Sequence, residues 1–494
     1  MLKNYIRIAW RNLLKNRIFS LINIFGLSVG IAFTMLIGAY VWGELQVNRQ
    51  LKNADNQYMI LSKWKDPNMG NEFTSIAELP KTLKADYPGL VADYYRSDLL
   101  GSVTVSKGDK HFHENLQIGD STLLKMYGFT LAAGDVKTAL NDPFDIVMTK
   151  KMAVKYFGNT NIIGQTLNVE GFSGDNHDFV ITGVLDETHR TTVTSQNADY
   201  NFFLSAAAEK FFKRDFEGWT NSGLQTYVEL QKGADPRAVE KVMELLLRKN
   251  APEQVSKNLT PYLMPLKKYN LVANGGVIKK MTYTLTCIAI FILLMAVINF
   301  VNICIGRSSG RMKEMGIRKV IGGLRKQIIW QFLVESIFMT LLATLLALIL
   351  YAGGRSYFSD VLNREIMSLL AFPVYAIPVF FVFALSVGLI AGIYPAIVLS
   401  ALNSIDSLKG KSNSVKESVL FRKALVAFQF MTAAIVLIGA IIVTQQINLC
   451  FSNNLGYSKD YVVYAQVPRD FSSAGVKKME AIRDQLAQMP QVSH

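Results

Sequence analysis

Residues 281–351 read MTYTLTCIAIFILLMAVINFVNICI, then GRSSGRMKEMGIRKVIGGLRKQ, then IIWQFLVESIFMTLLATLLALILY, and this apolar, basic, apolar order decides the fold. About 20 predominantly apolar residues in a helix are enough to span the hydrocarbon of a bilayer. The apolar segments 281–305 and 328–351 both reach that length, whereas the basic segment between them is too polar to span. We therefore predict two transmembrane helices that are joined by a short basic loop at 306–327.

Three further apolar stretches of spanning length lie at residues 19–43, 371–400 and 425–447. Half of the 494 residues are hydrophobic, and a composition with five such stretches excludes a purely soluble enzyme. Pro373, Pro378 and Pro395 interrupt the fourth stretch, so we expect kinks there and a span shorter than the stretch itself. The predicted fold class is an α-helical polytopic membrane protein with about five transmembrane helices.

The positive charge of the chain is concentrated in three segments. Lys and Arg number 52 against 38 Asp and Glu, which gives a formal net charge of +14. Residues 1–18 carry five basic and no acidic side chains, residues 306–327 seven and one, and residues 401–424 five and two. Because Lys and Arg accumulate in short cytoplasmic loops, we predict that these segments and the N-terminus lie in the cytoplasm. No segment combines basic and aromatic residues as nucleic-acid sites do, so no nucleic-acid partner is expected.

The segment 44–280 has balanced charge and is long enough to bury its own core. Residues 102–119 and 178–186 have the alternation of strands, and residues 234–249 have the pattern of a helix with Asp235 as its N-cap. These patterns predict a large α+β extracytoplasmic domain that is inserted between the first two transmembrane helices. Residues 448–494 resemble the start of a second, incomplete domain of this kind, which suggests a duplicated protein that has been cut short.

The chain has few residues that could carry chemistry of their own. His111 and His113 lie on one face of a predicted strand and could bind a metal, but no CxxC or HExxH motif accompanies them. Ordinary surface histidines are therefore the preferred interpretation, and no metal site is predicted. The sequence contains no GxxxxGK[ST] phosphate loop and no GxSxG elbow. We expect this chain to be no enzyme and to bind no cofactor.

Two basic segments have the period of amphipathic helices. Lys3, Arg7, Arg11 and Lys15 recur every four residues within 1–18, a pattern typical of a helix at the membrane interface. Such a helix would make membrane lipid a binding partner.

In the loop at 306–327, Met312, Met315, Val320 and Leu324 can share an apolar side around Gly316. This predicts a short amphipathic helix that ends at the Gly322–Gly323 pair and can dock on a partner protein. A solvated basic loop is the alternative interpretation.

Other residues inside the predicted spans carry weaker signals. Glu335 is the one acidic residue within a span, which makes it a functional hypothesis. Because it lies near the basic loop, we favour a structural ion pair or hydrogen bond over a proton relay. Gly26 with Gly30, and Gly388 with Gly392, have the GxxxG spacing that permits close helix packing.

Several segments together resemble the MacB/FtsX-like family of ABC transporter permeases. They are IAWRNLLKNRIFSLINIFGLSVGIA (8–32), RMKEMGIRKVIGGLRKQIIWQFLVES (311–336), AGIYPAIVLS (391–400) and FRKALVAFQF (421–430). Within the insert, MAVKYFGNTNIIGQTLNV (152–169) and FVITGVL (179–185) are similar to the MacB-type periplasmic core domain.

The resemblance implies a multi-pass permease of the bacterial inner (plasma) membrane that works by mechanotransmission. It would couple ATP hydrolysis by a separate cytoplasmic ABC ATPase, which holds ATP and Mg²⁺, to periplasmic export or efflux. The substrate would be an antimicrobial, a peptide or a lipid-linked compound. The residues implied to contact the ATPase are Arg311, Glu314, Met315, Gly316, Ile317, Arg318 and Lys319. A second permease half or copy and a periplasmic adaptor are further implied partners. The alternative is a signalling subunit, similar to FtsX or to bacitracin-sensing permeases, that controls a periplasmic or membrane partner.

Overall fold

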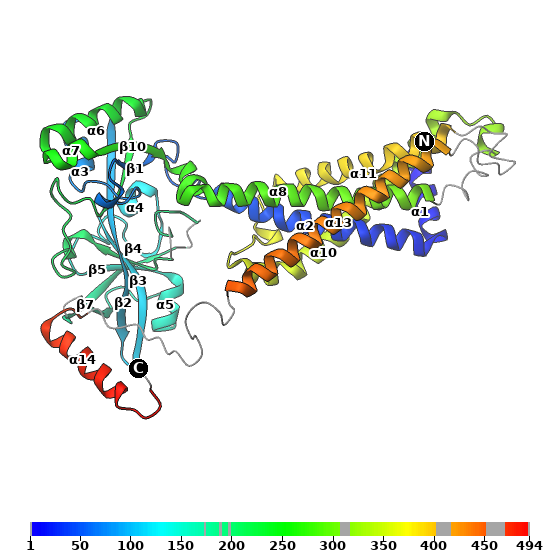
Figure 1. Ribbon diagram of the computed structural model, residues 1–494. Helices are drawn as coiled ribbons and strands as arrows, with labels where there is room; N and C mark the ends of the chain where they lie inside the picture. The colour runs from blue at the N-terminus through cyan, green and yellow to red at the C-terminus, as the bar shows by residue number, and fades with distance from the viewer. Residues whose placement is uncertain are drawn as a thin grey trace. The chain divides into compact units, whose positions relative to one another are not determined.

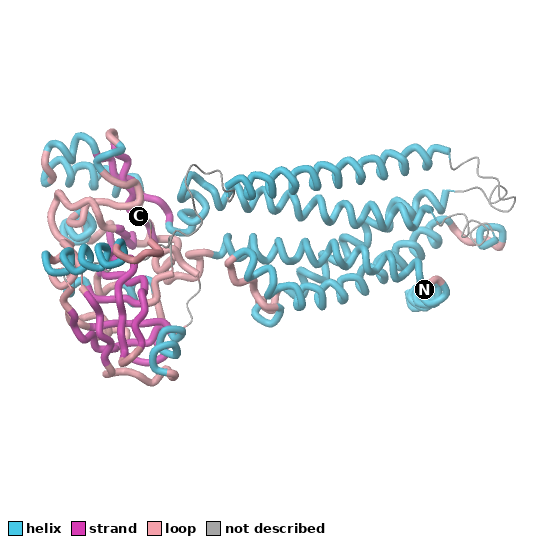
Figure 2. The backbone as a smooth tube through the Cα atoms, turned by 60° about the horizontal axis from the view of Figure 1, so that its bottom comes forward, coloured by secondary structure: helices cyan, strands magenta, loops and turns pink. Residues whose placement is uncertain are grey.

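A computed structural model describes residues 2–171, 174–186, 190–195, 199–306, 317–401, 416–450 and 470–492. The chain forms two compact units. Unit 1 comprises Met1–Glu44 and Lys279–Val463, and unit 2 comprises Leu45–Ile278 and Tyr464–His494. Within the described residues, unit 1 is helical and the strands belong to unit 2 (Figures 1 and 2). The predicted fold class, about five spanning helices with a large α+β domain inserted after the first, is confirmed.

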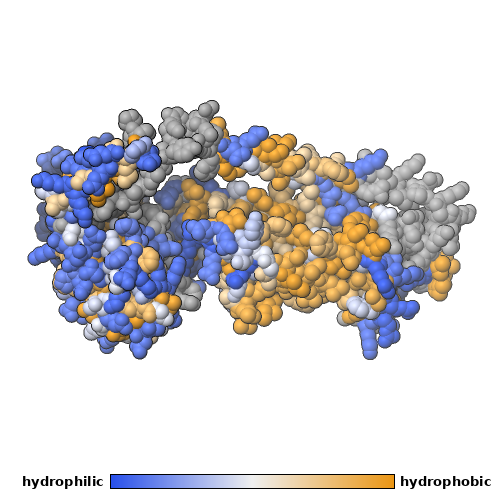
Figure 3. Space-filling view, turned by 90° about the horizontal axis from the view of Figure 1, so that it is seen from below, coloured by the Kyte–Doolittle hydropathy of each residue, from blue (hydrophilic) through white to orange (hydrophobic). Residues whose placement is uncertain are grey.

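Helices make up the described part of unit 1. They are α1 (Leu2–Lys15), α2 (Arg17–Gln46), α8 (Leu266–Gly306) from Lys279 onward, α10 (Arg325–Leu362), α11 (Ala376–Ala401) and α13 (Lys416–Cys450). All of these except α1 are long and apolar enough to cross a membrane. Apolar side chains gather over the surface of these helices, whereas unit 2 has a largely hydrophilic surface (Figure 3). This distribution is the one expected if lipid surrounds unit 1 and water surrounds unit 2.

Small residues let the helices of unit 1 approach closely. A Cβ atom added at Gly30 of α2 would lie 2.5 Å from the Cβ of Ala296 of α8. On α11, a Cβ added at Gly388 would lie 2.9 Å from Ile337 Cα, and one at Gly392 would lie 2.8 Å from Ser336 Cβ. Both predicted GxxxG pairs are therefore confirmed as packing surfaces, one between α2 and α8 and the other between α10 and α11.

The fourth spanning helix is shorter than its apolar stretch, as the sequence predicts. Helix α11 begins at Ala376, after a 3-10 turn at Leu369–Ala371, and retains Pro395 in its interior. Its spanning part, Ala376–Val398, is shorter than the apolar stretch at 371–400. Proline lacks an amide N–H and has a fixed φ. It is therefore tolerated in the first turn of a helix and disfavoured in the helix interior.

Unit 2 is built on a ten-stranded sheet in the order β10-β1-β9-β2-β3-β8-β5-β7-β4, with β6 pairing β2 and β7. The strands are β1 (Gln57–Trp64), β2 (Val91–Lys107), β3 (Lys110–Gly119), β4 (Leu131–Gly134), β5 (Asp145–Thr149), β6 (Thr166–Glu170), β7 (Asn176–Leu185), β8 (Phe202–Ser205), β9 (Gln225–Leu230) and β10 (Leu259–Pro265). The helices of this unit are α3 (Leu79–Asp86), α4 (Leu123–Tyr127), α5 (Lys150–Phe157), α6 (Pro236–Asn250), α7 (Glu253–Asn258) and α14 (Ser473–Ala487). The strands predicted within 102–119 and 178–186 are present, and the Asp235 carboxylate accepts the N–H of Arg237 as the predicted N-cap of α6.

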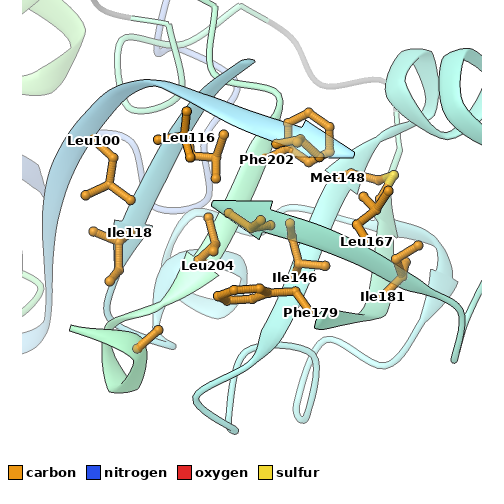
Figure 4. Close-up of a cluster of buried hydrophobic side chains, with 14 of the residues drawn as sticks. Leu100, Leu116, Ile118, Ile146, Met148, Leu167, Phe179, Ile181, Phe202 and Leu204 are labelled. Carbon is orange, nitrogen blue, oxygen red and sulfur yellow. The ribbon is translucent and has the colours of Figure 1, made fainter. Parts of the chain in front are cut away.

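The strand β2 belongs to two layers of this unit. Its second half pairs with β3 and, at Val105 and Ser106, with β6, so the strands β2, β3, β8, β5, β7 and β6 close a ring. Alternate side chains fill the ring with a core that includes Leu116, Ile118, Ile146, Met148, Leu167, Phe179, Ile181, Phe202 and Leu204 (Figure 4). The first half of β2 pairs with β9, and that part of the sheet is covered by α3 and α6 through a second core.

The edge strand β10 is closed to further strand pairing. The Lys65 N–H donates to the Asn258 oxygen, so the even-numbered residues of β10 face β1 in this antiparallel pair. Positions 259, 261, 263 and 265 alternate with them and face away from β1. Two of these positions are proline, the Leu259 N–H donates to Val255, and the Leu263 N–H donates to Glu240 Oε1 at 2.8 Å. A strand from another protein therefore finds no donor along this edge.

Candidate functional site

The described part of the basic segment 306–327, residues 317–327, forms an elbow that begins with a helical turn and ends in the first turn of α10. The Gly322 N–H donates to Lys319 O at 3.1 Å, and the Gly323 N–H donates to Arg318 O at 2.9 Å. Gly322 has φ +95°, so these bonds are the two of a Schellman motif, which ends a helix with a glycine in the left-handed region. The predicted break at Gly322–Gly323 is confirmed.

Neither glycine of this pair can carry a side chain without strain. The φ of Gly322 is one that other residues rarely adopt. A Cβ at Gly323 would lie 2.8 Å from the backbone oxygen of Arg318. The chain then enters α10, where Gln327 Oε1 accepts the Leu324 N–H at 3.1 Å and satisfies a donor at the helix start.

The cations of the elbow are bonded to the neighbouring helices. The Arg318 guanidinium donates to Gln331 Oε1 of α10. Lys319 Nζ donates to the backbone oxygen of Ser400 at 2.7 Å, and Arg325 Nε approaches Ser400 Oγ at 3.4 Å. Ser400 lies in the last turn of α11, where carbonyl groups have no partner within the helix and the helix dipole favours cations. Partial burial and the nearby Arg325 charge lower the pKa of Lys319.

The opposite face of the elbow is apolar and exposed. Ile317, Val320, Ile321 and Leu324 are between 49% and 79% exposed. Ile317, Val320 and Ile321 have the spacing of three and four residues that places them on one side of the helical turn, and Leu324 follows the glycine break. Exposed apolar side chains grouped in this way are typical of a surface that another protein or a membrane covers.

The structure separates the residues that the resemblance implied as ATPase contacts into three groups. Arg311, Glu314, Met315 and Gly316 lie outside the described residues. Ile317 is exposed on the apolar face. Arg318 and Lys319 instead make hydrogen bonds within the chain.

The sequence did not predict that Gln331 and Ser400 are the acceptors, or that Arg325 approaches Ser400 beside Lys319. Gln331 carried a signal, because it lies four residues before Glu335 on the same face of α10. Ser400 carried none, because it is 81 residues from Lys319 in the sequence.

Glu335 is buried in α10 one helical turn beyond Gln331. One turn further along the same face, the Phe338 ring lies edge-on to the Trp10 ring of α1, with centroids 6.1 Å apart. Glu335 has an interaction partner in the structure. Its predicted role in a structural ion pair or hydrogen bond stays a prediction.

Unit 2 contains an open cavity of about 680 Å³ where β1 ends and β10 begins. It is lined by Ser62, Lys63, Trp64, Pro67, Gly70, Glu72, Thr260 and Tyr262. The Tyr262 hydroxyl donates to Glu72 Oε1 across this cavity. His111 and His113 lie elsewhere on β3, and His111 Nδ1 is 2.8 Å from Ser106 Oγ. Among the described residues, no three His, Cys, Asp or Glu side chains group in a way that could hold a metal ion.

Two family descriptions match separate parts of the chain. A MacB-like periplasmic core domain matches residues 20–246, and an FtsX-like permease C-terminal domain matches residues 286–404. The first match covers much of unit 2, and the second covers the elbow and the helices on either side of it.

The relatives are similar at low identity. The uncharacterized ABC transporter permease YknZ of Bacillus subtilis is 23% identical over 82% of this chain and 98% of its own length. The macrolide export ATP-binding/permease protein MacB of Bdellovibrio bacteriovorus is 25% identical over 53% of this chain, which spans only 38% of that relative. The crystal structure of the periplasmic region of MacB from Actinobacillus actinomycetemcomitans is 14% identical, with a TM-score of 0.32 over 48% of this chain and 95% of that one.

Five spanning helices with an inserted α+β domain, together with these matches, define a multi-pass inner-membrane permease. The chain belongs to the MacB/FtsX-like family of ABC transporter permeases, as the sequence motifs indicate.

Proposed function

We propose that this chain is the membrane subunit of an ABC transporter of the mechanotransmission type. A separate cytoplasmic ABC ATPase would bind ATP and Mg²⁺ and hydrolyse the nucleotide. The chain would carry the resulting movement to its outer domain, which would drive export or efflux of an antimicrobial, a peptide or a lipid-linked compound. In this proposal the N-terminus and the elbow are cytoplasmic, and unit 2 is periplasmic.

The observation that carries the proposal is the two-sided elbow. Its apolar face, formed by Ile317, Val320, Ile321 and Leu324, is exposed, whereas Arg318 and Lys319 are bonded to α10 and α11. A force applied to the apolar face therefore passes through short polar contacts into two spanning helices. We assign the apolar face, together with Arg311, Glu314, Met315 and Gly316, to ATPase contact, and Arg318 and Lys319 to positioning of the elbow.

Substitutions of the two cations and of the apolar residues have different expected effects. Reversing Arg318 and Lys319 to Glu would break the contacts with Gln331 and Ser400 as well as any contact with a partner. Substituting Ile317 or Val320 changes only the exposed side of the elbow.

An efflux assay tests the proposal. Cells that express the wild-type chain with its ATPase are loaded with a panel of labelled macrolides, peptides and lipid-linked compounds, and the loss of each compound is followed with and without ATP depletion. We expect ATP-dependent loss of at least one compound and its disappearance in the Ile317→Glu and Val320→Glu variants. No ATP-dependent flux, combined with a protein that co-purifies through unit 2, would favour the signalling function instead.

The remaining partners follow from the same proposal. A second permease half or a second copy of this chain would supply the other side of the transporter. A periplasmic adaptor would bind unit 2, and membrane lipid would surround unit 1.

A further inference from the structure

Helix α1 presents a stripe of cations away from the bundle. Ala9 is buried, and the T-shaped contact of Trp10 with Phe338 of α10 fixes the helix against unit 1. Successive residues of a helix are turned by about 100°, so positions 7 and 11 point in roughly the opposite direction to position 9. Lys3, Arg7, Arg11 and Lys15 are all exposed along that outward side.

An exposed apolar stripe runs beside the cations. Ile6, Trp10 and Leu14 each precede a cation of the stripe by one residue, and each is between 43% and 49% exposed. The two stripes are therefore separated by about 100° around the helix. The apolar exposure continues onto the first turns of α2, where Ile18 and Leu21 are more than half exposed.

The four cations have no charge partner among the described residues. Throughout the residues that the structure describes, no Asp or Glu side chain forms an ion pair with Lys3, Arg7, Arg11 or Lys15. Other surface cations of the chain do find carboxylates, as Lys84 does at Asp93 and Lys257 at Glu253. The stripe therefore offers its full positive charge to a ligand outside the chain.

We propose that α1 is a binding surface for anionic phospholipid headgroups. A ligand for it needs an anionic group beside an apolar body, because the cationic and apolar stripes are adjacent. A phospholipid with net negative charge has that chemistry, with a phosphodiester for the cations and acyl chains for Ile6, Trp10 and Leu14. A free phosphate would meet the cations alone and would leave the apolar stripe in water. The inference needs no ATPase and stands apart from the proposed function.

The test uses the full chain, purified in detergent without any partner and stripped of co-purified lipid. Its melting temperature is measured against increasing dioleoyl phosphatidylglycerol, dioleoyl phosphatidylcholine or inorganic phosphate. We expect the wild-type chain to prefer phosphatidylglycerol by tenfold or more in half-saturating concentration, since each basic side chain near an anionic surface contributes roughly fivefold. Inorganic phosphate at matched concentration should leave the melting temperature unchanged.

Two variants with four Lys or Arg to Gln changes each make the test specific. The variant with Gln at positions 3, 7, 11 and 15 should lose the preference for phosphatidylglycerol, while its melting temperature in phosphatidylcholine stays that of the wild type. The control variant replaces four exposed lysines of unit 2, Lys151, Lys232, Lys241 and Lys249, and should keep the preference. Equal binding of the two lipids by the wild type, a preference that survives in the α1 variant, or an equal response to phosphate would each overturn the proposal.

Discussion

Individual residues decide how the elbow is held. Gly322 and Gly323 end its helical turn, the first with a positive φ that other residues rarely adopt and the second with no room for a Cβ beside the Arg318 oxygen. Arg318 and Lys319 each reach an acceptor on a different spanning helix. An exposed ion pair is worth little, but a charged donor on a buried acceptor contributes more because water competes less for it. Ser400 is fully buried, so the contact from Lys319 belongs to the second kind.

Substituting Gly323 by Ala should lower the stability of unit 1. The new Cβ would meet the Arg318 carbonyl oxygen at 2.8 Å, and the backbone atoms involved have little room to move. We expect a loss of about 1–3 kcal/mol, the usual cost of overpacking, seen as a lower melting temperature in detergent. The matched control is Gly353→Ala within α10, where no atom lies within 4 Å of the added Cβ. An unchanged melting temperature for Gly323→Ala would contradict the geometry of the elbow.

Arg318 and Gln331 should act as one unit. We expect the single changes Arg318→Gln and Gln331→Leu to reduce ATP hydrolysis by the assembled transporter, and the double change to cost less than their sum. Residues in direct contact show coupling of about 0.5–3 kcal/mol in such cycles. The activities of the four proteins, measured at equal concentration with the same ATPase, supply the cycle. Additive effects would mean that the hydrogen bond does not hold the elbow.

At the scale of elements, α10 and α11 pack closely against each other. This packing lets a force on Lys319 that reaches Ser400 of α11 pass on to α10. Gly388 and Gly392 bring α11 against Ile337 and Ser336, so a displacement of one helix is passed to the other through the backbone. Closely packed helices shift as rigid elements rather than deform continuously.

Leucine at Gly392 should separate these two helices. A Cβ alone would stand 2.8 Å from Ser336 Cβ, so a full leucine side chain has no space. We expect a clear fall in melting temperature, with overpacking costs of the order of 1–3 kcal/mol or more. Gly439→Leu on α13 is the control, because nothing lies within 4 Å of its added Cβ. Similar melting of the two variants would show that the α10–α11 contact is not tight.

Local sequence patterns predicted the helices and strands, but they did not predict the contacts between elements that are distant in the sequence. Apolar length identified the five spans, and Asp235 identified the start of α6, because both signals lie within one element. The closing pair of β6 with β2 could not be predicted, because it rests on only two residue pairs between distant segments. The same holds for the polar link between Asn302 of α8 and Gln429 of α13, whose amides are 3.2 Å apart.

At the scale of the whole molecule, the two units have separate cores. The ring of strands in unit 2 is filled by side chains such as Phe179 and Phe202, whereas Leu27, Phe300 and Ala343 belong to the core of unit 1. Unit 2 therefore buries its apolar side chains inside a sheet domain, and unit 1 buries its own between helices whose outer surface is suited to lipid.

Residues 45–278 should fold alone as a soluble domain. We expect a cooperative thermal transition by circular dichroism and no ATP hydrolysis. Phe179→Ala should lower the stability of this domain by about 3–5 kcal/mol, because it removes a fully buried ring. Val180→Ala, at the neighbouring exposed position of β7, is the control and should change stability little. A domain that aggregates or melts without cooperativity would show that it depends on unit 1.

The most direct test of coupling through the elbow is the amount of ABC ATPase that co-purifies with the tagged full chain, together with the ATP hydrolysis of the complex. We expect the wild-type chain to retain an ATPase, and the Val320→Glu and Ile321→Glu variants of the elbow to release it. Leu245→Glu, which alters an equally exposed apolar residue on α6 of unit 2, should retain it. Full retention and unchanged hydrolysis in both elbow variants would contradict the claim that an ATPase drives this protein through the elbow.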